Sequence, residues 1–194
     1  MKLLIATYNP HKAKEIKNIL EGADFEIHTL DEFDFSEVIE DGKTLLENAT
    51  KKATEYCLSS SLASLSDDTG FFVEVLDGKP GIYAARFAGE DCNFADNRKK
   101  VLKLLDGKTN RNAYFETVAV FADKGGVVAK TTGRVDGVIT CQELGNNGFG
   151  YDSIFIPNGS EKTFAQMTDK QKESFSHRTI AIKKIAKKIL EYKK

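Results

Sequence analysis

Two adjacent aspartates, Asp67 and Asp68, are the residues of this chain best placed to do chemistry. They follow an apolar run at 62–65 and precede another at 71–76, and both runs have strand character. We therefore predict two strands, with the acid pair where the chain leaves the sheet. Carboxylates there must face water, a cation or a reacting group. Aspartate oxygens suit Mg²⁺, which usually also meets substrate phosphates, and either residue can bind the metal or take a proton from water.

A second group of acids lies upstream of the pair. Glu37, Glu40 and Asp41 belong to an acidic, irregular stretch, and Glu47 follows Thr44 at the spacing of a capping box. A solvated loop is the alternative interpretation of the acidic stretch, and a helix cap is the alternative for Glu47. These acids are the candidates to join the aspartates around a metal.

The segment from Thr7 to Lys12 is a candidate phosphate site. A predicted strand leads into Asn9, a good helix cap, and Pro10, which suits the first helical position. The free amides and the dipole of a helix N-terminus attract phosphate. Lys12 would neutralise a triphosphate, and Glu15, three residues further along the same face, would hold Lys12 or another base. A capped surface helix is the alternative.

Two later motifs are candidates for recognising a base. In residues 148–152, two glycines flank Phe149, so the backbone can approach a ligand closely while the ring stacks on it. A tight turn with a core phenylalanine is the alternative. Lys172, His177 and Arg178 lie near the start of the last predicted helix, where Arg178 can bind phosphate or a base carbonyl and His177 can donate to a carbonyl. A polar cluster at a helix start is the alternative there.

The elements that carry these residues mix strand and helix patterns. We predict strands at 2–7, 25–30, 62–65, 71–76, 113–122 and 127–132, with a short apolar run at 154–156. Helices are predicted from Pro10 to Gly22, after Thr44, at 93–105 and at 174–194. Residues 80–89 have the pattern of a loop or lid. This order favours a mixed-sheet α/β fold over a strict βαβ repeat, in a single domain covering residues 1–194.

The composition is that of an ordinary globular domain, with 41% hydrophobic and 29% charged residues. A net charge of −1 provides no general attraction to nucleic acid or to an anionic membrane. The three cysteines are widely spaced, which argues against a zinc site and favours reduced thiols. No apolar stretch reaches the ~18 residues of a spanning helix, and no signal peptide precedes Lys12. We therefore expect a cytoplasmic enzyme, with neither nucleic acid nor membrane as partner.

The order of the motifs is more specific than any one of them. The chain contains Thr-x-Asn-x-x-Lys-x-x-Glu from Thr7, Glu-Asp-Gly-x-Thr-x-x-Glu-Asn-Ala-x-x-Lys-Ala from Glu40, Ser-Asp-Asp-Thr-Gly, Pro-Gly-Ile-Tyr-x-Ala-Arg, Gly-Phe-Gly-Tyr-Asp and Ser-His-Arg. From Thr7 to Arg178 it strongly resembles the inosine triphosphate pyrophosphatase family, enzymes that hydrolyse non-standard purine nucleoside triphosphates.

This resemblance implies cleavage of ITP, dITP and XTP between the α- and β-phosphates, with Mg²⁺ as cofactor and the monophosphate and pyrophosphate as products. It also implies an elongated α/β domain of two lobes around a long central mixed β-sheet, with flanking helices and a nucleotide cleft between the lobes. Homodimers are usual in the family, so we expect one here.

The resemblance also suggests roles for individual residues. Asp68 matches the proton acceptor and metal ligand, and Glu40 looks like the second metal acid, although Glu37 is near enough to leave that choice open. The matched substrate-binding positions are Thr7, Tyr8, Asn9, Pro10, His11, Lys12, Lys52, Thr69, Phe149, Gly150, Tyr151, Asp152, Lys172, His177 and Arg178. Two positions depart from the common pattern: Thr69 stands where Ser is common, and Ser153 where Pro is common.

Base chemistry agrees with the resemblance. Hypoxanthine and xanthine carry a 6-oxo acceptor, whereas adenine carries an amino donor. Donors from the region of His177 and Arg178, or from backbone amides, would pair with the oxo base and leave adenine poorly paired. Guanine shares the 6-oxo group and must be refused at its 2-amino side.

Two other functions stay open. A pyrophosphatase of related fold would act on pyrimidine or other modified nucleotides. A non-catalytic nucleotide-binding or RNA-binding module would bind without turnover, but the acid pair argues against it, because carboxylates repel phosphates unless a metal is present.

Overall fold

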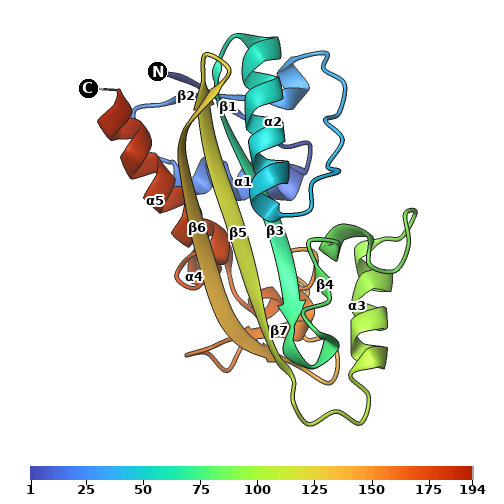
Figure 1. Cartoon of the computed structure of the whole chain (residues 1–194). Helices are drawn as coiled ribbons and strands as arrows, with labels where there is room; N and C mark the ends of the chain where they lie inside the picture. Colours follow the sequence, from blue (N-terminus) through green and yellow to red (C-terminus); the bar gives the residue numbers. More distant parts are fainter. Residues whose placement is uncertain (194) are drawn as a thin grey trace. The chain divides into compact units, whose positions relative to one another are not determined.

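The structure of the chain, a computed structural model, describes residues 1–193 (Figure 1). The α-helices are α1 (Pro10–Ile19), α2 (Leu45–Ser60), α3 (Phe94–Leu104), α4 (Asp169–Glu173) and α5 (His177–Tyr192). The strands are β1 (Lys2–Ile5), β2 (Glu26–Thr29), β3 (Ala63–Val73), β4 (Pro80–Gly81), β5 (Asn112–Asp123), β6 (Gly126–Ile139) and β7 (Phe155–Pro157). Within the described residues, no helix is both long and apolar enough to cross a membrane.

The strands are hydrogen-bonded in the order β2-β1-β3-β5-β6-β7, with β4 attached to β3. Strand β1 is parallel to both β2 and β3, whereas the β3–β4 and β6–β7 pairs are antiparallel. Parallel pairing requires a crossover connection, which α1 provides between β1 and β2. The predicted mixed-sheet α/β fold is therefore confirmed.

The chain forms two compact units. The first contains Met1–Asp68, Thr117–Gly133 and the C-terminal segment from Arg178. The second contains Thr69–Glu116 and Arg134–His177. Strands β3, β5 and β6 each contribute residues to both units, and the boundary in β3 falls directly after Asp68.

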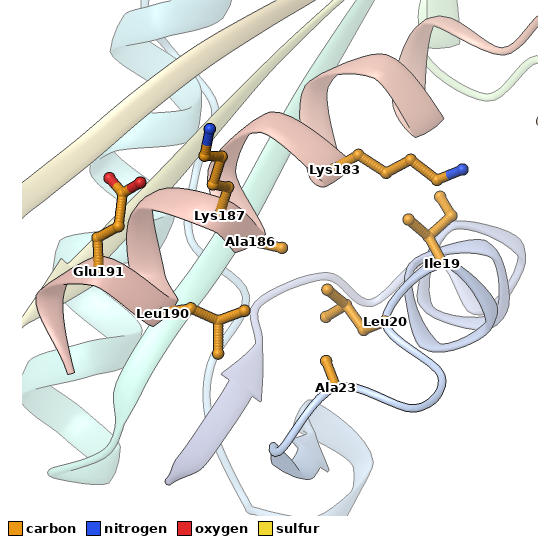
Figure 2. Close-up of a pocket in the computed structure, with 8 residues that line it drawn as sticks. All are labelled: Ile19, Leu20, Ala23, Lys183, Ala186, Lys187, Leu190 and Glu191. Atoms are coloured by element: carbon orange, nitrogen blue, oxygen red, sulfur yellow. The ribbon is translucent and has the colours of Figure 1, made fainter. Parts of the chain in front are cut away.

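In the first unit, helices α1 and α5 cover one face of the strands. Near the C-terminal ends of these helices a groove remains between them, lined by aliphatic side chains such as Ile19, Leu20 and Leu190 and flanked by Lys183 and Lys187 (Figure 2). None of the predicted site residues lines this groove.

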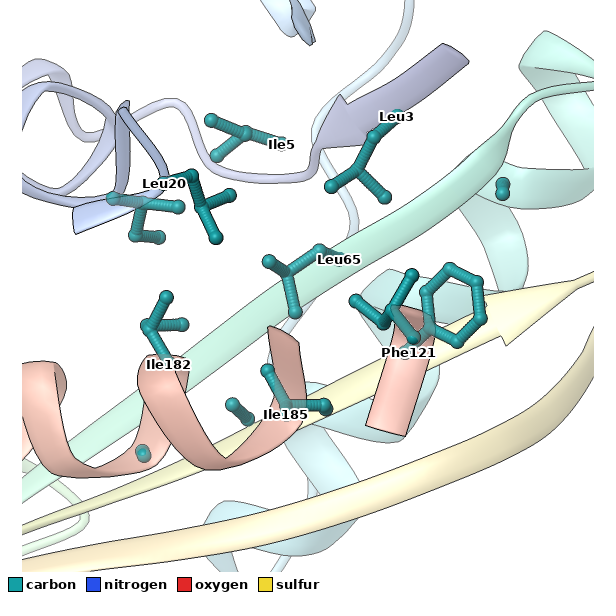
Figure 3. Packing of buried hydrophobic residues seen from close by; sticks show 12 residues of the cluster. Leu3, Ile5, Leu20, Leu65, Phe121, Ile182 and Ile185 are labelled. Carbon is teal, nitrogen blue, oxygen red and sulfur yellow. The ribbon is translucent and has the colours of Figure 1, made fainter. Parts of the chain in front are cut away.

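The core of the first unit follows from the two-residue repeat of its strands. Leu3 and Ile5 of β1 pack with Leu65 of β3 against α1 and α5 (Figure 3). The intervening residue Leu4 packs instead in a cluster with Tyr56 of α2. Because successive strand residues point to opposite faces, α1 and α5 cover one face of this part of the sheet and α2 the other.

The second unit has an aromatic core of its own. Phe71 of β3 lies with its ring centroid 4.6 Å from that of Phe115 and 4.5 Å from that of Tyr151. Phe155 and Phe164 complete this group and are fully buried. Phenylalanine rings thus make up much of the core of this unit and pack around the ring of Tyr151.

Three predicted element boundaries were wrong. Residues 62–65 and 71–76 are not two strands separated by a turn, because β3 runs without interruption from Ala63 to Val73 and a short 3₁₀ helix follows at Glu74–Leu76. The last helix starts at His177 rather than at 174, and the short helix α4 precedes it. Strand β6 continues to Ile139, well beyond the predicted end at 132.

Candidate nucleotide-binding and catalytic site

Because β3 is continuous, Asp67 and Asp68 lie inside a strand and not at its end. The predicted position at a strand end is therefore wrong. Of the three surroundings predicted for the pair, namely water, a cation or a reacting group, water is not the main one, because Asp67 is 0% and Asp68 6% exposed. Adjacent strand residues point to opposite faces, so Asp67 shares the face of Leu65 against α1 and α5. Asp68 shares the face of Ser66, whose hydroxyl donates to the Ala49 carbonyl of α2 at 2.5 Å.

Asp67 is held by two cations from the helices on its face. Its Oδ2 lies 3.2 Å from Lys12 Nζ and accepts a hydrogen bond from Arg178 Nε at 3.1 Å. Burial by itself would raise the pKa of Asp67, but the charges of Lys12 and Arg178 outweigh it and hold that pKa below its usual range. The surroundings of Asp67 therefore favour its charged form.

Arg178 is the connection between Asp67 and Glu15. Its guanidinium is 2% exposed, and its Nη1 donates to Glu15 Oε2. Burial lowers the pKa of Arg178, but the two carboxylates raise it by more. The prediction that Glu15 holds Lys12 or another base is thus met by the second option, since Glu15 binds Arg178. With two carboxylate partners, Arg178 is arranged to hold Asp67 and, through it, Lys12.

Asp68 lies in a different environment on the other face. Its Oδ2 accepts a hydrogen bond from Asn48 Nδ2 at 3.1 Å, and Asn48 Oδ1 accepts one from the Gly42 amide at 2.8 Å. Burial raises the pKa of Asp68 and the charge of Glu40 adds to this, against the opposite effects of Lys52 and Lys12. A carboxylate with a raised pKa is a better proton acceptor than an ordinary aspartate.

Lys52 of α2 joins the acids on this face. Its Nζ lies 2.7 Å from Glu40 Oε1 and 2.8 Å from the Asp67 carbonyl oxygen. Burial lowers the pKa of Lys52, but Asp68 and Glu40 raise it by more, so the net shift is upward and the amine stays charged. Of the two candidates for a second metal acid, Glu40 is the one that contacts this group, which favours it over Glu37.

The carboxylates on this face fit a divalent cation that keeps several non-protein ligands. The charge of Glu40 helps to raise the pKa of Asp68, as one anion does to another that shares its site, and a cation between them would relieve that repulsion. Within residues 1–193 no three side chains of the His, Cys, Asp or Glu type form a complete metal cage. Mg²⁺ typically binds one or two carboxylates and fills its shell with water and phosphate oxygens, so this donor set suits it.

The predicted cap of the first helix is confirmed. Asn9 Oδ1 accepts hydrogen bonds from the amides of His11 and Lys12, and Pro10 opens α1. Thr7 Oγ1 accepts one from the Asn9 amide at 3.2 Å. Three residues of this segment, Thr7, Tyr8 and Pro10, also line a pocket with Lys14 and Lys17 of α1. The amides at this helix start are thus bonded within the segment, so the helix dipole and the nearby lysines are what suit it to phosphate.

In the second unit, Asp152 fixes the loop of residues 148–152. Its Oδ2 accepts hydrogen bonds from the Phe149 amide at 2.9 Å and from Lys172 Nζ at 2.7 Å. The ammonium of Lys172 also lies 5.1 Å from the centre of the Phe149 ring, within cation–π range. Gly148 has φ +72, and a Cβ there would overlap the Asp152 carboxylate. The structure therefore brings together three of the residues predicted to bind substrate, Phe149, Asp152 and Lys172.

The remaining predicted residues of the second unit have structural contacts of their own. Tyr151 is buried, donates through its hydroxyl to the Ala84 carbonyl at 2.7 Å, and has a pKa raised by burial. His177 stacks on Phe115, with the ring centroids 4.7 Å apart and the planes 16° from parallel. Thr69 is half-buried in β3. Tyr151 is thus an anchor for the loop, and His177 is an imidazole fixed by an aromatic ring.

Sequence reasoning missed several residues that hold this machinery. Asn48 orients Asp68, Arg98 contacts the loop of residues 148–152, and Glu143 holds Arg98. Asn48 lies on the same face of α2 as Lys52, four residues away, and this spacing could have indicated its role. Nothing in the sequence around Arg98 indicates its role, because its partners are more than 40 residues away.

Taken with the fold, these contacts define an α/β protein with a buried carboxylate and lysine cluster suited to phosphate and a divalent cation. The chain belongs to the Ham1 family, whose model matches residues 3–188. It is 43% identical over 197 residues to a dITP/XTP pyrophosphatase from Thermoanaerobacter pseudethanolicus, covering 98% of each chain. It is 44% identical over 196 residues to one from Elusimicrobium minutum, covering 97% of this chain and all of the relative.

A solved structure leads to the same family. The Staphylococcus aureus Ham1 protein is similar over 100% of both chains, with a TM-score of 0.87 and 35% sequence identity. The resemblance inferred from the ordered motifs is thereby confirmed.

Proposed function

We propose that this protein hydrolyses non-standard purine nucleoside triphosphates, namely ITP, dITP and XTP, to the monophosphate and pyrophosphate. Asp68 carries the proposal: a buried carboxylate of raised pKa, oriented by Asn48, in a chain whose relatives are named dITP/XTP pyrophosphatases. In the reaction, water attacks the α-phosphorus, the bond from the α-phosphorus to the bridging oxygen breaks, and pyrophosphate leaves with that oxygen.

Each residue of the first unit has a role in this reaction. Asp68 accepts the proton of the attacking water. Lys12 and Lys52 neutralise the charge of the phosphates, together with the dipole of α1. Asp67 holds Lys12 in place, and Arg178 with Glu15 holds Asp67. Burial lowers the pKa of Lys12, and the charges of Lys52 and Arg178 add to this, whereas the charge of Asp67 opposes it. Asp68 therefore takes part in the reaction, whereas Asp67 holds a residue that binds the phosphates.

Asp68 and Glu40 would hold Mg²⁺, and the ion, when bound, would neutralise charge on the phosphate oxygens. Lys52, bonded to Glu40, would keep that carboxylate aimed at the site.

The second unit supplies groups suited to a purine base. The ring of Phe149 offers a stacking surface, and Asp152 and Lys172 hold its loop in one conformation. The backbone of residues 148–152 and the imidazole of His177 offer hydrogen-bond donors to a 6-oxo group. A site built in this way rejects a base that lacks the acceptor, because its donors then stay unpaired.

A pyrophosphate-release screen over ITP, dITP, XTP, GTP, ATP, dUTP and methylated nucleotides tests the proposal. We expect ITP, dITP and XTP to be turned over far faster than the others. The assignment would be wrong if orthophosphate were the direct product, or if ATP and GTP were turned over as fast as ITP. Preference for dUTP or for the methylated nucleotides would support the alternative, a pyrophosphatase for other nucleotides. ITP binding without turnover in Mg²⁺ would support a binding module.

We also propose a homodimer in the cytoplasm, as the resemblance implies. Light scattering of the purified protein tests the assembly, and cell fractionation with an antibody tests the location. A monomer at micromolar concentration would contradict the first part.

A further inference from the structure

Helix α3 supports the loop of residues 148–152 through two side chains one turn apart. Phe94 places its ring centroid 6.0 Å from that of Phe149, and Arg98 Nη1 donates to the Gly150 carbonyl at 2.9 Å. Residues i and i+4 lie on the same helix face. One face of α3 therefore contacts both the ring and the backbone of this loop.

Arg98 is itself held from a second direction. Its Nε donates to Glu143 Oε2 at 2.7 Å, and the same oxygen accepts a hydrogen bond from the Ser153 hydroxyl at 3.1 Å. Because the guanidinium is planar and rigid, two partners at different nitrogens fix its orientation. The contacts thus run from Ser153, directly after the loop, through Glu143 and Arg98 back to Gly150. Ser153 is the position where Pro, which has no hydroxyl, is common in the family.

Gly150 is a point at which this loop can change what it presents to a ligand. Its φ is +61, and glycine, which lacks a Cβ, also restricts ψ little; ψ of Gly150 and φ of Tyr151 are the two torsions that turn the peptide between these residues. A trans peptide is planar, so the carbonyl of Gly150 and the amide of Tyr151 point in opposite directions. By binding the carbonyl, Arg98 fixes the direction of the Tyr151 amide. If this peptide turned over, the side of the loop opposite α3 would offer an acceptor in place of a donor.

We propose that Arg98 is a positioning residue for base selection, which holds the Gly150–Tyr151 peptide so that the loop offers a donor to a 6-oxo purine. This inference rests on the proposed function and adds a residue that does not contact the base. The 6-oxo group accepts a hydrogen bond, whereas the 6-amino group of adenine donates one. Without Arg98, the peptide can flip and offer a carbonyl in place of an amide. The 6-oxo purine then loses a hydrogen-bond donor and adenine gains an acceptor, so the preference for the 6-oxo base weakens.

The test compares Arg98→Met with Lys99→Met. Methionine keeps an unbranched apolar side chain at position 98 but removes every donor. Lys99 is exposed on the same helix, so its variant removes the same charge next to the site and serves as the control. Arg98→Lys keeps the charge without the two-nitrogen geometry and should recover only part of the effect.

Two quantities are measured: kcat and KM for ITP and ATP, and amide hydrogen exchange over residues 149–152. We expect Arg98→Met to lower the ratio of kcat/KM for ITP over ATP about tenfold, the loss expected for one charge-assisted hydrogen bond. The loss for ITP should appear mainly as a higher KM and not as a lower kcat, since the phosphate cluster is unchanged. The loop amides should exchange faster in Arg98→Met than in Lys99→Met or the wild type.

Three results would overturn the inference: an unchanged ratio, an equal loss for ITP and ATP, or the same ratio change in Lys99→Met. A wild type that releases no pyrophosphate from ITP would instead remove the proposed function, and base selection by Arg98 with it. In that case the exchange measurement still decides whether Arg98 positions the loop, and unchanged protection would show that it does not.

Discussion

Asp67 lies against two cations from α1 and α5, whereas Asp68 lies against an amide of α2 and within the field of Glu40. Both side chains are buried, yet the pKa of Asp67 is lowered and that of Asp68 is raised. The difference comes from their neighbours, because burial acts on both in the same direction. Removing the charge of Asp68 should therefore affect mainly turnover, whereas removing the charge of Asp67 should affect mainly stability.

Asp68→Asn should abolish turnover and leave the fold intact. The amide has the size of the carboxylate but is a poor proton acceptor and a weak ligand for Mg²⁺. Removing a general base typically costs about two to four decades in rate. Steady-state pyrophosphate release measures the loss, and circular dichroism checks the fold. Near-normal turnover in a folded variant would transfer the role to Asp67 or Glu40.

Asp67→Asn should instead lower stability. The change leaves Lys12 without its buried counter-ion and Arg178 with Glu15 alone. Breaking one side of a buried ion pair costs about 3–5 kcal/mol, and we expect the lower end because Arg178 keeps one carboxylate. Urea unfolding gives the value.

Asp41→Asn is the matched control for that variant, since the Asp41–Lys51 pair lies in solvent. It should change the unfolding midpoint little. If Asp67→Asn proved as stable as this control, the buried cluster would not need its central charge.

At the scale of elements, the loop of residues 148–152 depends on two glycines for different reasons. Both have positive φ, but only at Gly148 would a Cβ overlap a neighbour, the Asp152 carboxylate. A Cβ on Gly150 would meet open space. Alanine in a left-handed conformation costs about 1–2 kcal/mol at either position.

Gly148→Ala should therefore lose more stability than Gly150→Ala, together with the contact between Asp152 and Lys172. Thermal unfolding of the two variants gives the difference directly, and KM for ITP reports the loop. Equal losses would mean that the Asp152 side chain moves aside without cost.

Elements with local signals could be predicted from the sequence. Asn9 and Pro10 identify the start of α1, and Asn93 with Asp96 caps α3 at its predicted position. Strand β3 could not be predicted in full, because two adjacent carboxylates inside a strand are favourable only when distant cations face them. Lys12 lies 55 residues before Asp67 and Arg178 lies 111 residues after it, distances that no local pattern reports.

Contacts between residues distant in sequence also limited the prediction of the candidate site. The candidate site residues were predicted from ordered motifs, whereas Arg98 and Glu143 belong to none of them. Asn48 lies within the motif that begins at Glu40, but that motif does not show that Asn48 meets Asp68. The value of these three residues comes from the atoms they meet after folding, such as the Gly150 carbonyl and the Asp68 carboxylate. Sequence patterns therefore report the groups that would touch a substrate better than those that hold them.

At the scale of the whole molecule, a net charge of −1 conceals strong local charges. The acids around Asp68 are balanced by Lys12 and Lys52, so this cluster does not depend on a metal for its neutralisation. The apolar cores of both units are likewise complete without one. Metal should therefore matter for catalysis and not for folding.

Removing divalent cations with a chelator should stop pyrophosphate release from ITP while shifting the melting temperature little. Adding Mg²⁺ back should restore turnover in full, because the fold has not been lost. Assays before and after dialysis, with parallel thermal unfolding, make the comparison. Turnover that persists in the chelator would rule out a metal role for Glu40 and Asp68, and unfolding on chelation would make the ion structural.

Because side chains alternate between the two faces of β3, the number of strand residues before Asp67 decides which face each aspartate occupies. One extra residue inserted just before Asp67 would turn that carboxylate away from Lys12 and Arg178 and would present Asp68 to them instead. Inserting two residues would restore the faces and merely slide the pair along the strand. An insertion before Asp67 therefore preserves the two faces only when it has an even number of residues, and the same restriction applies to any attempt to graft the aspartate pair onto another sheet.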